Sequence, residues 1–154
     1  MDITYKSVWN DLSKINVNQH TQKKMNLTFL SWAWAWGVMM EKYPQLEFEF
    51  KVWTANEKDY SCGYFPEGSA EVECTVKIGD LSRTMWLPVM DNRNNSIANP
   101  SSRQVSDTKM RCLVKCFALY GLGHYIYAGE DIPSETKGLS IRHQEQIAKE
   151  KANG

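Results

Sequence analysis

The stretch AEVECTVKIGDLSRTMWLPVM, residues 70–90, decides the fold that we expect for this chain. Its first nine residues alternate apolar and polar side chains, which is the period of a half-buried strand. Gly79-Asp80 is a two-residue hairpin turn, and Pro88 fits a sheet edge or the end of the return strand. The stretch therefore predicts an antiparallel hairpin that is buried on one face. The side chains expected to face the core are Val72, Cys74, Val76 and Ile78.

Further strands are predicted on the N-terminal side of this hairpin. LEFEFKVW at 46–53 alternates in the same way, and YSCGYF at 60–65 is a short candidate strand. A long helix is predicted after the hairpin, from Ser101 or Ser102 to a glycine cap at Gly121. With a helix also predicted before the strands, the order indicates an α+β fold, in which two long helices flank an antiparallel meander of three or four strands.

The helix before the strands is predicted at 26–44, NLTFLSWAWAWGVMMEKYP, with Thr28 or Ser31 as its cap and Pro44 as its end. It is apolar nearly all round, which indicates burial on two sides. We interpret one of these sides as the contact with a neighbouring subunit of a homo-oligomer. The residues expected at that contact are Trp32, Trp36 and Met39.

The chain of 154 residues is long enough for one domain with a core and a tail. We expect a polar N-terminal segment at 1–26, a core domain at 27–133, and a charged tail at 134–154 that is mobile or docks on a partner. Four cysteines do not form the dense framework of a small secreted protein. No signal peptide and no membrane-length apolar run are visible, so we expect a cytoplasmic protein.

Charge is segregated along the chain although the net charge is zero. Residues 41–80 carry nine acidic and four basic side chains, whereas residues 92–128 carry five basic side chains and one acidic one. Such a distribution fits either a local phosphate site or head-to-tail contacts between subunits. A solvated charged face gives the same pattern, so charge alone does not separate these interpretations.

The helix predicted after residue 101 carries the basic residues in a narrow stripe. At 100° per residue, Gln104, Thr108, Arg111 and Lys115 lie within about 60° of arc. A polar stripe on a half-exposed helix is the simpler interpretation, and an electropositive track for a nucleic-acid backbone is the alternative. Lys109 falls on the apolar side, so it must extend along the surface or face a partner. The candidate DNA contacts are Arg93, Asn94, Arg103, Lys109, Arg111 and Lys115.

Enzymatic chemistry has little support in the sequence. There is no phosphate-binding loop of the Walker type, and Cys112 and Cys116 are better explained as buried apolar residues than as metal ligands. A metal nuclease using His124, Glu130 and Asp131 is judged unlikely, because a turn-forming acidic pair is far commoner. We therefore expect no catalytic residues, no metal and no cofactor. A structural oligomer that serves as a protein-interaction module remains the alternative to DNA binding.

Three segments, in order, resemble the single-strand annealing proteins of bacteriophages. They are LTFLSWAWAWGVMMEKYP at 27–44, RTMWLPVMD at 83–91 and MRCLVKCFALYGLGHYIYAGEDIP at 110–133. The closest resemblance is to the small Sak type, which is grouped with the ERF-type and Rad fifty-two-like annealing recombinases. The resemblance covers roughly residues 27–133.

The resemblance implies a β-β-β-α core that assembles into rings or helical filaments. Single-stranded DNA would lie in a positively charged groove of the assembly, and complementary strands would anneal without ATP. Arg111 and Lys115 would hold the DNA backbone, and Arg103 and Arg93 would close over it. The expected location is the cytoplasm of an infected bacterial host. A host single-stranded-DNA-binding protein or a phage exonuclease would be natural protein partners for this family.

Overall fold

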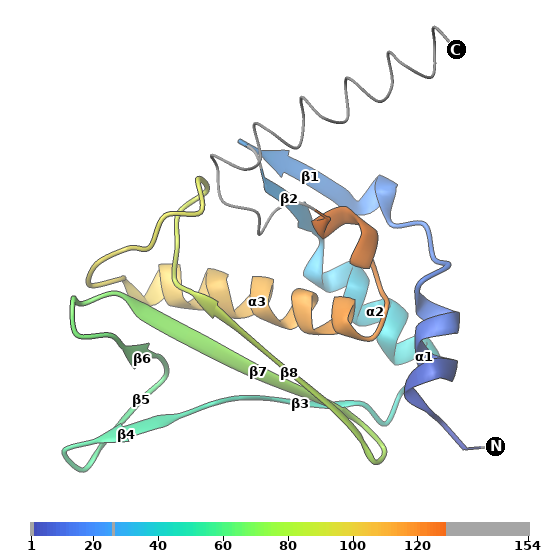
Figure 1. Ribbon diagram of the computed structural model, residues 1–154, viewed down its shortest axis with the longest axis horizontal. Coiled ribbons are helices and arrows are strands. Elements are labelled where there is room, and N and C mark those ends of the chain that lie inside the picture. Colours follow the sequence, from blue (N-terminus) through green and yellow to red (C-terminus); the bar gives the residue numbers. More distant parts are fainter. Residues whose placement is uncertain (1, 26, 129–154) are drawn as a thin grey trace, which may run out of the picture.

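The computed structural model of the chain describes residues 2–25 and 27–128 (Figure 1). The first helix, α1 (Tyr5–Leu12), begins at a capping box, in which the Thr4 hydroxyl accepts a hydrogen bond from the backbone N–H of Ser7. Its Val8 and Leu12 side chains are fully buried in the main core. The N-terminal segment, which was expected to be a separate polar piece, therefore contributes to the same core as the rest of the described chain.

A β-hairpin follows, formed by β1 (Thr21–Lys24) and β2 (Leu27–Leu30), which pair antiparallel. Of the two predicted caps of the next helix, Ser31 is confirmed and Thr28 is wrong, because Leu27–Leu30 uses its backbone groups to pair with β1. The helix α2 (Trp32–Lys42) begins at Ser31, whose hydroxyl accepts a hydrogen bond from the backbone N–H of Trp34. The boundary predicted after residue 26 thus falls between two paired strands.

The main sheet is antiparallel throughout, and β7 is its central strand. β3 pairs with one side of β7, β8 pairs with the other, and the short β6 lies beside the start of β7. A separate two-stranded hairpin, β4–β5, continues from β3. The strands are β3 (Glu47–Phe50), β4 (Trp53–Ala55), β5 (Lys58–Tyr60), β6 (Gly63–Tyr64), β7 (Ala70–Ile78) and β8 (Leu81–Pro88).

The hairpin predicted from residues 70–90 is confirmed. Ile78 pairs with Leu81 across the two-residue turn, where Gly79 adopts a φ of +59° that favours glycine. Pro88 is the last residue of β8, which has no strand on its outer side among the described residues. The four side chains expected to face the core are all buried, at 2% exposure or less.

The helix α3 (Ser102–Leu119) lies across one face of this sheet (Figure 1). The Cys112 and Cys116 thiols donate to the carbonyl oxygens of Met85 and Arg83 on β8, at 3.2 and 3.3 Å. Burial raises the pKa of the Cys112 thiol to about 12, so this cysteine acts as a packed core residue. The Tyr120 hydroxyl after the helix donates to the β7 backbone at 2.7 Å.

Helix α2 packs against α3, and the rings of Trp36 and Phe117 stack with centroids 6.5 Å apart. Two 3₁₀ helices, Asn18–His20 and His124–Tyr127, complete the described elements. The α+β fold class, the antiparallel sheet and the two long helices are confirmed. Within the described residues, no helix is both long enough and apolar enough to cross a membrane.

The opposite face of the sheet carries no helix in the described part of the chain (Figure 1). The Thr75 and Thr84 hydroxyls meet there at 2.8 Å, in the middle of the β7–β8 pair. Because side chains alternate along a strand, the glutamates of β3 and β7 share this face with them. We call it the acidic sheet face, and define it by Glu47, Glu49, Glu71 and Glu73.

Candidate nucleic-acid interface

Cations from two elements gather around the ring of Phe29 on β2. The Arg111 guanidinium lies 4.7 Å from the ring centroid, and the Lys24 ammonium lies 5.4 Å from it. One helical turn after Arg111, the Lys115 ammonium lies 5.2 Å from the ring centroid of Tyr127. Each distance is in the range of a cation–π interaction. Residues of β2 and the two α3 cations line one small shared hollow, so these elements are in direct contact.

We call this surface the basic face, and define it by Lys24, Phe29, Arg111, Lys115 and Tyr127. Its position follows from the hairpin, which turns at Met25 with a φ of +56°. The hairpin is attached to α2, because the rings of His20 and Trp34 stack with centroids 4.0 Å apart and nearly parallel planes. The backbone N–H of Ser31 also donates to the His20 carbonyl at 2.9 Å. The hairpin therefore places Lys24 beside α3.

The sequence predicted Arg111 and Lys115 as part of this site but did not indicate Lys24 and Phe29. The segment TQKKMNLTFL lacks the strict alternation of the main strands, and its second half was assigned to a helix. The available signal was the adjacent lysine pair before Met25, at a turn flanked by polar residues. Lys24 comes close to Phe29 and Arg111 only because the folded hairpin lies against α3, and local sequence does not show that contact.

Lys109 lies on the other flank of α3, away from the basic face. Its ammonium is 5.3 Å from the centroid of the Phe50 ring on β3. It also borders a hollow together with Cys62 and Tyr64 of the β6 region. The expectation that this lysine must extend along an apolar surface is consistent with that position. The structure does not bring Lys109 together with Arg111 and Lys115.

Arg103 and the loop before α3 form local contacts of their own. The Arg103 side chain is exposed and forms an ion pair with Asp107 at 3.4 Å, one turn along the helix. Arg93 and Asn94 lie in a turn organised by Asp91, whose carboxylate accepts from the backbone N–H groups of Arg93 and Asn95 at 2.8 and 3.0 Å. These hydrogen bonds hold the pKa of the Asp91 carboxyl below its usual value.

The three residues expected at an oligomer contact differ in exposure. Trp32 is 48% exposed at the start of α2, and Trp36 is partly buried beside β3. Met39 has no exposed surface, because it packs into the core of the same protomer. Only the two tryptophans are thus available to a neighbouring subunit in this structure.

The described residues offer no candidate metal centre, since no three His, Cys, Asp or Glu side chains come together there in a suitable arrangement. The four cysteines are buried and form no disulfide. His124 packs edge-on against Trp9, with ring centroids 5.1 Å apart. Glu130 and Asp131, the other residues of the nuclease alternative, lie outside the described residues, as does the tail predicted at 134–154.

Cations from β1 and α3 thus gather on one surface of this α+β fold. Comparison with protein families gives a match over residues 6–153 to the model described as Sak Single Strand Annealing Protein. The chain belongs to this family of single-strand annealing proteins, and the resemblance noted over 27–133 is confirmed and extends in both directions. No curated protein and no solved structure matched the chain.

Proposed function

We propose that this protein binds single-stranded DNA through the basic face and anneals complementary strands without ATP, in homologous recombination of a phage genome. The observation that carries the proposal is the convergence of Lys24 and Arg111 on Phe29, with Lys115 one turn further along α3. These cations come from distant parts of the sequence, so a polar stripe on one helix does not account for them.

The chemistry of the basic face suits a nucleic-acid backbone. Phosphate contacts by Arg and Lys supply affinity that does not depend on base sequence, and annealing requires this because any pair of complements must be accepted. The rings beneath the cations limit their rotamers, so less conformational entropy is lost when a phosphate binds. Contacts to phosphates leave the base edges available for pairing with a second strand.

We also propose that several copies of the protein assemble into a ring or a helical filament. A few cations on one protomer bind DNA weakly, but their repetition along an oligomer adds the contacts on a single strand. A protomer with zero net charge associates without strong overall repulsion. Annealing of this kind is non-catalytic and uses only binding energy, so it needs no metal and no nucleotide cofactor.

We assign a secondary role in DNA binding to Arg93, Asn94 and Arg103. Arg93 and Asn94 lie in the loop that precedes α3, and Arg103 is exposed in the first turn of α3. We infer that they contact the DNA backbone beyond the basic face, after exchange of the Arg103–Asp107 ion pair for a phosphate. Lys109, on the β3 flank of the helix, is the least suited of the six candidates to touch the same strand.

The test is annealing of two complementary labelled oligonucleotides in EDTA without ATP. The Arg111→Ala/Lys115→Ala double variant should lose annealing and single-strand binding while it keeps its circular dichroism spectrum. The matched control is Lys58→Ala/Lys77→Ala, which removes the same charge from β5 and from the open side of β7. This control should anneal like the wild type.

Absence of both annealing and single-strand binding by the wild type at low salt would overturn the proposal. The oligomeric protein-interaction module would then be the better account. If the test variant and the control lose the same amount of annealing activity, annealing would still be the function, but the basic face would not be the site that performs it.

A further inference from the structure

A largely apolar hollow adjoins the basic face, between β8, the last turns of α3 and the 3₁₀ helix His124–Tyr127. Its volume of about 610 Å³ is in the range of small-ligand sites. Lys115 and Tyr127 of the basic face form part of its wall, so the two surfaces are continuous. We call it the β8 hollow, and define it by Met85, Trp86, Leu87, Lys115, Ala118, Leu119, His124, Tyr127 and Ala128.

The order of residues along α3 relates the hollow to the proposed phosphate contacts. Arg111 is followed one turn later by Lys115, and Leu119, one turn after that, lines the hollow. Each helical turn rises about 5.4 Å. In a nucleotide, only the sugar separates the phosphate from the base. A strand with a phosphate at Lys115 can therefore place the attached base in the hollow.

The lining of the hollow suits the flat faces of a nucleobase. Leu87 and Leu119 supply apolar side chains, and His124 and Tyr127 add aromatic rings. Every base has a π face, so walls of this kind accept any base. Among the described residues, no aspartate or glutamate lines the hollow, and Lys115 gives its wall a positive charge. These features favour a base that is attached to a phosphate.

The backbone of β8 can meet the edge of such a base. The Tyr5 hydroxyl donates to the Ser82 carbonyl and accepts from the Ser82 N–H, so these backbone groups point away from β7. Because backbone direction alternates along a strand, the N–H and C=O of Trp86 also point away from β7, where β8 lines the hollow. Each base carries a donor beside an acceptor on the edge that pairs with a complement. One N–H and one C=O can therefore bind that edge without selecting a sequence.

We propose that the β8 hollow holds one unpaired base of the strand whose phosphates lie on the basic face. The inference rests on the proposed function, and it adds a contact that only a single strand can make. A duplex carries about one charge per 1.7 Å and a single strand about one per 3.4 Å, so cations alone favour the duplex. A paired base has no free edge for the hollow. A complementary strand competes for that edge, and pairing releases the base.

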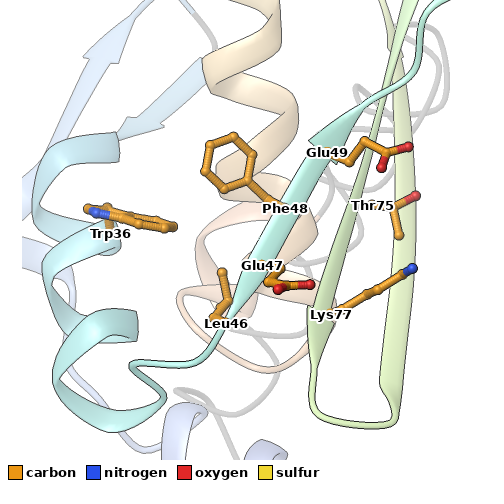
Figure 2. Close-up of a pocket in the computed structure, with 7 residues that line it drawn as sticks. All are labelled: Trp36, Leu46, Glu47, Phe48, Glu49, Thr75 and Lys77. Atoms are coloured by element: carbon orange, nitrogen blue, oxygen red, sulfur yellow. The ribbon is translucent and has the colours of Figure 1, made fainter.

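A second hollow, of about 500 Å³ beside β3, differs from the β8 hollow in charge. Figure 2 shows Trp36 and Phe48 pointing toward one another there, and the Glu49 side chain pointing away from them. Glu47 and Glu49 both line this hollow, so it repels the phosphate attached to a base. Both glutamates belong to the acidic sheet face. The hollow beside β3 therefore offers a control position of similar size.

The first test measures binding of two strands to the wild-type protein by fluorescence anisotropy at one salt concentration. One strand is an oligothymidylate, and the other is an abasic sugar-phosphate strand of the same length. The two strands carry the same phosphates and differ only in their bases. We expect the oligothymidylate to bind about tenfold tighter or more, since contacts to bases contribute affinity that phosphates do not. Equal affinity for the two strands would overturn the proposal.

The second test fills the hollow. Leu119→Trp enlarges a half-buried side chain that lines it, whereas Leu119→Met keeps the side-chain volume. We expect Leu119→Trp to bind both strands with the affinity that the wild type has for the abasic strand. Leu119→Met should keep the wild-type preference, and so should Phe48→Trp, which adds the same ring to the hollow beside β3.

Ala128→Trp fills the β8 hollow from an exposed position if Leu119→Trp does not fold. A folded variant with a filled hollow that keeps the preference for the oligothymidylate would overturn the proposal. If filling the hollow changes the mass of the oligomer but not this preference, the hollow holds a neighbouring subunit and the proposal is wrong.

The outcomes separate this inference from the proposed function. If the wild type anneals complements but binds both strands equally, the proposed function stands and the assignment of the hollow is wrong. If neither strand binds at low salt, the proposed function fails, and the assignment of the hollow fails with it.

Discussion

The basic face and the acidic sheet face lie in different layers of one protomer and carry opposite charge. On the basic face, cations from β1 and α3 are held over the rings of Phe29 and Tyr127. On the acidic sheet face, four glutamates follow β3 and β7, and Lys77 is the basic side chain among them. A net charge of zero therefore hides two strong local fields. The comparison teaches that the net charge of the chain does not describe how charge is arranged on its surface, and it is this arrangement that the proposed function uses.

Reversing the charge of each face should give the largest contrast. Arg111→Glu/Lys115→Glu replaces two phosphate contacts by repulsion, and we expect single-strand affinity to fall by about 100-fold or more at low salt. Glu47→Lys/Glu49→Lys changes charge by the same amount in the opposite direction on the acidic sheet face. It should leave affinity equal or slightly higher, as measured by fluorescence anisotropy. A comparable loss in both variants would show that the two faces do not differ in DNA binding.

Lys24 of the β1–β2 hairpin should have the next largest effect. Lys24→Ala removes one cation, and each lost phosphate contact reduces the slope of log affinity against log salt by about 0.7 for single strands. We expect a reduction of this size, with the fold retained because the side chain is exposed. Salt titration of binding measures the slope, with Lys58→Ala/Lys77→Ala as the control. An unchanged slope would remove the hairpin from the site.

Phe29 tests whether the ring positions the cations. Phe29→Ala removes the surface under Arg111 and Lys24, and each cation–π contact at an exposed site contributes about 0.5–1 kcal/mol. We expect single-strand affinity to fall about fivefold to thirtyfold on this basis, whereas Phe29→Tyr should bind like the wild type. Thermal unfolding must be followed in parallel, because the ring also packs in the hairpin. If the alanine and tyrosine variants bind alike, the ring has no positioning role.

Tyr43 lies on neither face and should affect stability alone. Its hydroxyl donates to Asp11 at 3.0 Å, and burial, followed by this hydrogen bond, raises its pKa to about 12. The folded protein then holds the proton more tightly than the unfolded chain, whose tyrosine pKa is about 10. This stabilisation is complete below pH 10 and is lost as the pH rises toward 12.

Tyr43→Phe should therefore lower the free energy of unfolding by about 1 kcal/mol at neutral pH and reduce its decline between pH 10 and 12. Urea unfolding at several pH values measures both quantities. Single-strand affinity at neutral pH should not change. If the free energy of unfolding of the variant falls between pH 10 and 12 as steeply as that of the wild type, groups other than Tyr43 cause the loss of stability at alkaline pH.

The sequence was sufficient for the elements whose pattern is local. Strict alternation and Gly79-Asp80 predicted β7 and β8, and Ser101 with Gly121 bounded α3, because caps and turns depend on neighbouring residues alone. The stripe of Arg111 and Lys115 followed from helical spacing for the same reason. Local patterns thus predicted the β7–β8 hairpin, the long helix and the two α3 cations of the basic face.

The remaining part of the basic face depends on contacts between distant residues. Leu27–Leu30 is a strand because β1 pairs with it, and no periodicity in LTFL indicates that partner. The flank occupied by Lys109 depends on where β3 lies, so helical spacing could not separate it from the other cations. In the same way, the burial of Met39 results from packing of α2 against α3.

The most direct test of the central claim is lysine footprinting with and without a saturating single-stranded oligonucleotide. Acetylation rates of individual lysines, measured by mass spectrometry, report both faces in one experiment. We predict protection of Lys24 and Lys115 by DNA, and unchanged rates at Lys58 and Lys77. Protection of Lys58 and Lys77 with no change at the basic face would contradict the account.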